Sequence, residues 1–282
     1  MPVVPVTPRV RNPPLRWRLS VEKLTAPQLG RVRRAMSGTQ RLSDDRGYQR
    51  FAGIHGLPLP VYCQHSTDEG FAQLFLPWHR AYLYFFERAL RDVVPSVAHP
   101  WWDWTRPSPQ NKGIPAAYAD QDDADGDPNP LFQAQIGDEA MRQARRAGIG
   151  LPNVTRRQPG LPGTRLPRKE QVDALIDERD FWTFSNKIED LHGRVHVYVG
   201  GQAGHMTEIA LAAYDPIFWA HHTMIDRIWR LWELKNGHPS FTSAFLGTAL
   251  PPFPMTVAQT LSVEALGYDY AGGAATTPAG GG

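Results

Sequence analysis

The sequence predicts a mainly α-helical protein of one domain, a four-helix bundle with long irregular loops. Apolar residues recur at helical spacing over 78–93 and 216–234, and a further helical block begins near residue 169. The 25 glycines and 26 prolines exceed average usage, which indicates long loops between the helices. We find no internal repeat of fixed period in the 282 residues, so we expect one domain over 1–270 and a flexible Gly/Ala-rich tail over 271–282.

The helices can be justified in chain order. Residues 26–38 form a basic stretch that we expect on the surface, and the helix over 78–93 is bracketed by Pro77 and Pro95. The aromatic run PWWDW follows, in which Trp102 and Asp103 are predicted to have structural roles. The stretch 105–168 is rich in Pro, Gly, Asp and Asn and is predicted to be loop.

The acidic run DDADGDPNP at 122–130 is the one candidate calcium loop. With Gly126 in the glycine position of an EF-hand, the first and last ligand positions would be Gln121 and Phe132. Because Phe132 cannot ligate calcium, the template fails and we expect a solvated loop.

Charge and hydropathy exclude several classes of partner. The 30 basic and 28 acidic residues leave a net charge of +2, which predicts neither a nucleic-acid partner nor an anionic membrane surface. No apolar run reaches the roughly 18 residues that would span a bilayer. The first residues lack the apolar core of a secretory signal, so the chain as encoded is expected in the cytoplasm, with export by another route left open.

Histidine is the residue type that points to chemistry. Cys63 is the single cysteine, which excludes a disulfide framework and a thiolate zinc cluster, so a metal would be held by some of the ten histidines. His192 and His196 lie four residues apart and share one face of a helix, and Asp226 lies one turn after His222, where a carboxylate could accept an imidazole N–H. The other candidates are His79, near the start of the helix over 78–93, and His55 and His65, which we expect on the loop-like stretch before it. An imidazole-only ligand set favours copper, although scattered polar histidines remain the alternative.

Three segments then resemble a known family. FLPWHRAYLYFFE (75–87) is similar to the CuA signature of the tyrosinase family, and DPIFWAHHTMID (215–226) is similar to its CuB signature. LHGRVHVYVGG (191–201) resembles the helix that carries the first CuB ligands, so the likeness extends from about residue 55 to 234. The family contains tyrosinases, catechol oxidases and molluscan hemocyanins, and the resemblance implies a helical bundle around a dicopper centre.

The resemblance also implies the ligands of both copper ions. CuA would be held by His55, His65 and His79, and CuB by His192, His196 and His222, with His221 and Asp226 around them. His65 and His79 are fourteen residues apart where the family usually has nine, as if five residues were inserted. The Cys63-x-His65 spacing resembles that of family members with a Cys–His thioether; a buried thiol is the alternative reading.

The implied activity is oxidation of o-diphenols to o-quinones with O2 as co-substrate, and in true tyrosinases also ortho-hydroxylation of monophenols. Glu189 resembles the glutamate that holds a water near CuB, although a surface acid is the simpler reading. Gly193 and Val197 follow the first two CuB histidines and favour o-diphenols, and Ile209 falls at the position of a gate residue above CuA.

Two other functions could use the same histidines. Reversible O2 binding, as in hemocyanins, needs the same histidines. In carriers and zymogens of the family a C-terminal domain covers the copper site, and GYDY (267–270) resembles the Tyr-x-Tyr element that closes the catalytic domain before it. We expect this chain to lack the covering domain, which favours the enzyme. A zinc hydrolase would need a mixed ligand set with a carboxylate base, which the sequence does not offer. The expected partners are small phenols, with a copper-delivery protein as a further possibility.

Overall fold

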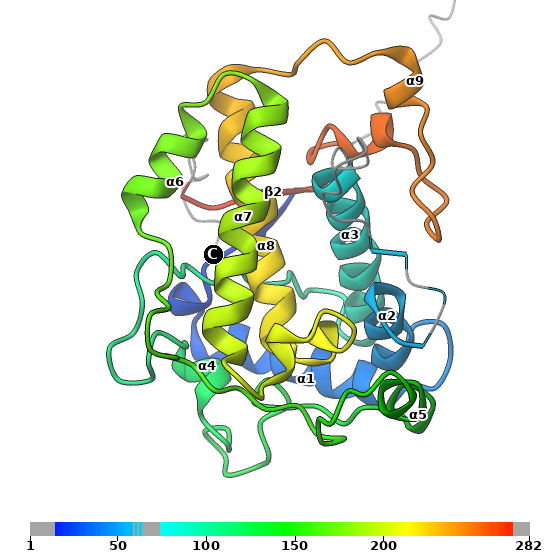
Figure 1. Cartoon of the computed structure of the whole chain (residues 1–282), viewed down its shortest axis with the longest axis vertical. Helices are drawn as coiled ribbons and strands as arrows, with labels where there is room; N and C mark the ends of the chain where they lie inside the picture. The colour runs from blue at the N-terminus through cyan, green and yellow to red at the C-terminus, as the bar shows by residue number, and fades with distance from the viewer. Residues whose placement is uncertain (1–14, 59, 61, 64–73, 273–282) are drawn as a thin grey trace, which may run out of the picture.

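The structure is a computed structural model of the chain, and it describes residues 15–58, 60, 62–63 and 74–272. The mainly α-helical fold is confirmed. Three long helices dominate it: α3 (Phe75–Val93), α7 (Phe181–Gly200) and α8 (Pro216–Asn236). Figure 1 shows α7 and α8 running side by side through the centre, with α3 along one flank and the short α2 (Tyr48–His55) near its lower end.

The other elements are short or peripheral. They are α1 (Ala26–Arg41), α4 (Ala116–Ala119), α5 (Asp138–Arg146), α6 (Lys169–Ile176), α9 (Ser243–Leu246) and the 3-10 turns η1 (Val21–Lys23), η3 (His205–Thr207), η4 (Ala212–Tyr214) and η5 (Val257–Thr260). None of the helices in the described ranges has the length and apolar character that a bilayer span requires.

Local caps explain where the main helices begin. Asp215 accepts a hydrogen bond from the backbone N–H of Ile217 at 3.1 Å, and Pro216 occupies the first turn of α8, where its missing N–H costs nothing. The start of α3 differs from the prediction, because the helix begins at Phe75 and takes Pro77 into its first turn. First-turn N–H groups have no partner inside the helix, so proline is tolerated there.

The helical block predicted from residue 169 is two helices rather than one. α6 ends at Ile176, and α7 starts anew after Asp180, whose carboxylate accepts the N–H of Thr183 at 2.8 Å. The stretch 105–168 is mostly loop as predicted, but it contains α5, which buries only the small face formed by Ala140, Met141 and Ala144.

A parallel strand pair joins segments from opposite ends of the described chain. β1 (Arg16–Arg18) pairs with β2 (Tyr268–Tyr270), with Arg16 opposite Tyr268 and Arg18 opposite Tyr270. Neither strand was predicted from the sequence. The tail predicted over 271–282 lies outside the described residues from 273 onward.

Large aromatic side chains fill the space between the helices. Trp102 and Trp104 of the PWWDW run are fully buried, and Asp103 accepts a hydrogen bond from the Thr105 hydroxyl at 2.5 Å. Phe86 of α3 stacks on Trp219 of α8 with ring centroids 3.6 Å apart, which fixes the two helices against each other. This contact holds α3 and α8 at the distance where their histidines meet.

Candidate metal centre

Six histidines from four helices converge in the interior. α7 supplies His192 and His196, α8 supplies His221 and His222, α3 supplies His79, and α2 supplies His55. Each of the six is no more than 7% exposed. His55 was expected on a loop-like stretch, but it is the last residue of α2 and is therefore fixed by a helix end.

The tightest group lies between α7 and α8. The Nε2 atom of His222 lies 3.3 Å from Nε2 of His192 and 3.4 Å from Nε2 of His196. Two imidazole nitrogens bound at about 2 Å to one ion at a tetrahedral angle lie roughly 3.3 Å apart, so these separations fit a shared metal ion. One nitrogen each from His192, His196, His221 and His222 lies within 4.8 Å of the others.

Backbone carbonyls orient two of the rings. Nδ1 of His79 donates to the carbonyl of Phe75 at 2.8 Å, and Nδ1 of His196 donates to the carbonyl of Met206 at 2.7 Å. A carbonyl only accepts hydrogen bonds, so Nδ1 carries the proton and Nε2 presents its lone pair to the cluster. This is the usual way in which a protein fixes the tautomer of a metal-binding histidine.

Burial keeps the rings on α8 neutral. Desolvation lowers the pKa of His221 and of His222 well below its ordinary value, and the neighbouring histidines add to the effect. Neither ring nitrogen of His221 has a hydrogen-bond partner among the described residues. His221 was expected around the ligands; the structure places its ring 5.2 Å from that of His192 and nearly parallel to it.

A second group contains His55, Cys63 and His79, whose ligand atoms lie within 4.8 Å of one another. The sulfur of Cys63 is 3.6 Å from Nε2 of His79. Burial raises the pKa of the Cys63 thiol, and the charge of Glu189 raises it further. His65, the other predicted CuA ligand, lies outside the described residues, so the Cys63–His65 thioether stays a prediction; intact mass would reveal it as the loss of a pair of hydrogens.

The two groups adjoin each other through His222. Its ring stacks on that of His79 with centroids 4.5 Å apart, and it lies 6.1 Å from that of His55. Phe218, which sequence reasoning did not place in the site, packs between them, with its ring 4.1 Å from that of His222 and 4.7 Å from that of His55. Its position four residues before His222 on one helix face was the available signal.

The expected contact of Asp226 with an imidazole is not made among the described residues. Its carboxylate instead accepts hydrogen bonds from Arg80 at 2.5 Å and from the hydroxyls of Tyr268 at 2.7 Å and Tyr270 at 2.5 Å. Burial alone would raise the pKa of Asp226, but the guanidinium groups of Arg80 and Arg18 hold it below its usual range. Asp226 therefore links α8 to α3 and β2 and does not bind an imidazole ring of the described residues.

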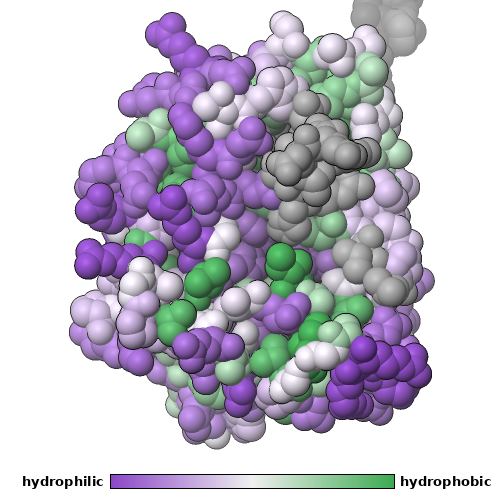
Figure 2. Space-filling view, viewed as in Figure 1, coloured by the Kyte–Doolittle hydropathy of each residue, from purple (hydrophilic) through white to green (hydrophobic). Residues whose placement is uncertain are grey.

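A cavity of about 280 Å³ opens beside the histidines, close to the lower end of the range for small-molecule sites. It is lined by His55, Glu189, His192, Gly193, His196, Val197, Thr207 and Ile209. Val197 and Ile209 are exposed, at 39% and 55%, so they lie at the surface edge of this cavity. Figure 2 shows hydrophobic residues scattered over the lower half of this face, around the C-terminal part of α7.

The arrangement defines a class of protein: a helical bundle with a buried, imidazole-rich centre beside a small cavity. The family described as the common central domain of tyrosinase matches residues 45–235, and the chain belongs to that family.

Among relatives, the chain is 35% identical to a tyrosinase of Streptomyces antibioticus over 74% of this chain and 80% of the relative. It is 30% identical to a hemocyanin of Enteroctopus dofleini over 84% of this chain, and it spans only 20% of that much longer protein.

Solved structures agree with this assignment. A functional unit of octopus hemocyanin superposes with a TM-score of 0.73 at 27% identity, covering 91% of this chain and 68% of the other. A tyrosinase of Burkholderia thailandensis gives a TM-score of 0.72 at 25% identity, covering 94% and 75%.

Proposed function

We propose that this chain binds a pair of copper ions and oxidises o-diphenols to o-quinones with O2. The convergence of the Nε2 atoms of His192, His196 and His222 beside a cavity of about 280 Å³ is the observation that carries the proposal. Neutral imidazoles suit copper because they are intermediate donors that add no charge. The tyrosinases of Streptomyces at 33–35% identity support the same activity.

The histidines form two groups, one for each copper ion. His192, His196 and His222 would hold one ion, and His55 and His79 would contribute to the other, with His65 as the third ligand expected from the sequence. When bound, the copper pair supplies the redox chemistry between O2 and the phenol. The chain's own side chains bind the ring, orient it and move its proton.

The residues that line the cavity support the remaining roles. Ile209 and Val197 form an apolar edge that admits a flat ring and covers it from water. Glu189 lies in the same wall and is the carboxylate that would accept the phenol proton, directly or through a water. Gly193 contributes no side chain, and Val197 no polar group, which favours o-diphenols over monophenols.

Oxygen uptake by the copper-loaded protein tests the proposal, with 4-methylcatechol and tyramine as substrates and His222→Ala as the inactive control. Quinone from the catechol alone identifies a catechol oxidase, and quinone from both identifies a tyrosinase. Binding of O2 with turnover of neither would favour the second candidate, reversible O2 binding, which the likeness to hemocyanins suggests.

A further inference from the structure

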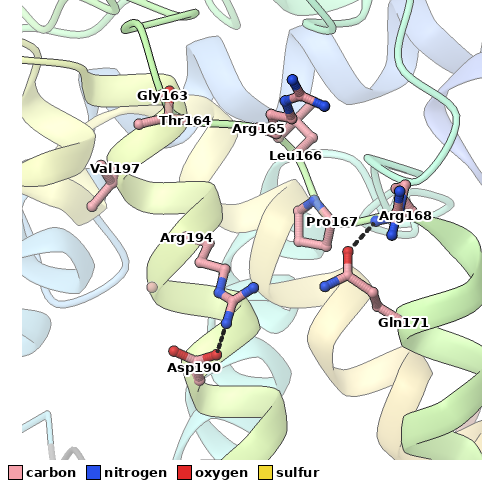
Figure 3. A pocket seen from close by; sticks show the side chains of 11 residues that line it. Gly163, Thr164, Arg165, Leu166, Pro167, Arg168, Gln171, Asp190, Arg194 and Val197 are labelled. Atoms are coloured by element: carbon pink, nitrogen blue, oxygen red, sulfur yellow. Dashed lines mark hydrogen bonds and ion pairs between the residues drawn. The ribbon is translucent and has the colours of Figure 1, made fainter.

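A second, larger cavity lies next to the one beside the histidines. Its volume is about 750 Å³, and Gly193 and Val197 line both cavities. Figure 3 shows it between α7, which carries Asp190, Arg194 and Val197, and the segment from Gly163 to Arg168 that leads into α6. The two cavities therefore meet along one side of α7.

Helix geometry explains how they connect. Gly193 and Val197 each follow a histidine of the cluster by one residue, a rotation of about 100° around the helix axis. A side chain at position 193 would stand in the passage, but glycine has none, and a Cβ atom built there meets nothing within 4 Å. A ring held over His192 and His196 can therefore extend its substituent across Gly193 into the larger cavity.

Most of the charged residues that line the larger cavity are cationic. Arg165, Arg168 and Arg194 line it, and Asp190 is the one carboxylate among its described lining residues. Arg194 forms an ion pair with Asp190 at 2.6 Å, and both side chains are more than half exposed. Arg165 and Arg168 are exposed and have no ion-pair partner among the described residues. Two cationic side chains are thus left to bind an anion.

We propose that this cavity binds the carboxylate of the substrate, so that the protein prefers catechols with an acidic chain para to one hydroxyl. Guanidinium groups bind carboxylates through paired, charge-assisted hydrogen bonds, which distinguishes an acid from an alcohol or an amine. The proposal rests on the proposed function, because it names the substrate class of the same site.

Three substrates with the same catechol ring test it: 3-(3,4-dihydroxyphenyl)propionate, 4-methylcatechol and dopamine. We expect kcat/KM to fall in that order, and the ratio of acid to neutral substrate to fall in 0.5 M salt, because exposed charges are screened. Arg165→Gln and Arg168→Gln should each lower the ratio by about two- to fivefold, the range of an exposed ion pair. Arg145→Gln on α5, which removes the same charge outside the cavity, should leave it unchanged.

A variant with the opposite expected effect on the substrate ratio strengthens the test. Asp190→Asn removes the carboxylate that pairs with Arg194 and should raise the ratio of acid to neutral substrate. A ratio that is the same in the wild type, both arginine variants and Asp190→Asn would overturn the proposal, as would a preference for dopamine.

A binding measurement separates this proposal from the proposed function. 3-Phenylpropionate and 3-phenylpropanol cannot be oxidised as catechols, and calorimetry should show tighter binding of the acid, by about two- to fivefold per arginine engaged. If no catechol is oxidised, the proposed function fails, and this comparison still decides the role of the cavity. Equal affinity for the acid and the alcohol would overturn the carboxylate site alone.

Discussion

His221 and His222 are neighbours on α8 and both are fully buried, yet their nitrogens lie in different surroundings. Nε2 of His222 is within 3.4 Å of two other imidazole nitrogens, whereas His221 contributes a stacked ring. We expect His222→Ala to abolish catechol oxidation and to lose the copper of this group. His221→Ala should lower copper affinity by only about 10–100-fold, as changes around metal ligands do.

Copper analysis after dialysis, together with competitive titration, measures the difference. Each variant is the size-matched control for the other, because both remove a fully buried imidazole. Greater copper loss from His221→Ala would exchange the two assignments.

Ile209 allows a second prediction at the scale of one side chain. It is 55% exposed at the edge of the cavity, so a larger side chain there does not overpack the core. Ile209→Phe should raise KM for 4-methylcatechol severalfold and leave the free energy of unfolding within about 0.5 kcal/mol of the wild type. Leu234→Phe, at an apolar position 45% exposed on α8 and outside the cavity, is the control for surface bulk. A fall in Tm with an unchanged KM would instead make Ile209 a packing residue.

Two helical glycines give opposite predictions for the same substitution. Alanine at Gly193 in α7 meets no neighbour, whereas alanine at Gly38 in α1 would collide with the side chain of Val93. Gly193→Ala should therefore raise the free energy of unfolding by about 0.5–1 kcal/mol, the helix propensity difference. Gly38→Ala should lower it by about 1–3 kcal/mol, the usual cost of overpacking. Urea unfolding of both variants measures the contrast, and equal signs would contradict it.

Local patterns sufficed to predict the long helices, because their apolar periodicity extends over several turns. They did not reveal α5, whose buried face consists of two alanines and a methionine, because so small an apolar face gives little periodic signal. The strands β1 and β2 are three residues each and pair across almost the whole chain, so no local window contains both partners.

Part of the candidate site could likewise be predicted from the sequence, and part depends on tertiary packing. Residue type and i, i+4 spacing pointed to His192 and His196, and the resemblance assigned the other candidate histidines to the two copper ions. The carbonyl of Met206 and the sulfur of Cys63 reach their histidines only through tertiary packing. The partners of Asp226 could not be predicted for the same reason: the tyrosines that bind it, in place of the expected imidazole, lie more than 40 residues away.

At the scale of the whole molecule, buried ion pairs connect β1, α3 and α8, and the tyrosine hydroxyls of β2 bind to the same cluster. Arg18 binds Glu87 and Asp226, and Arg80 binds Asp226 and Glu233. Removing one member leaves uncompensated charge in the interior, so Asp226→Asn should cost about 3–5 kcal/mol at neutral pH. Asp173→Asn, which breaks an exposed pair with Lys169, should cost less than about 0.5 kcal/mol.

The same cluster predicts a dependence on pH. The pKa of Asp226 is lower in the folded protein than in the unfolded chain, where it is about 3.9. Its stabilisation is therefore complete above that value and is lost as the pH falls through the folded pKa. As the pH falls below about 4, the stability of the wild type should decline more steeply than that of Asp226→Asn, as urea unfolding at each pH would show. Parallel declines would remove Asp226 from the acid response.

The pairing of β1 with β2 has a consequence for biosynthesis. Arg18 donates to the hydroxyl of Tyr270 at 2.9 Å across 252 positions of sequence, so a nascent chain cannot close this contact until residue 270 has left the ribosome. Until then Arg18 and Asp226 lack the tyrosine hydroxyls of β2, and native pairing of such high contact order forms slowly. The bundle that carries the histidines can assemble first, whereas its closure by β2 has to wait until residue 270 has emerged.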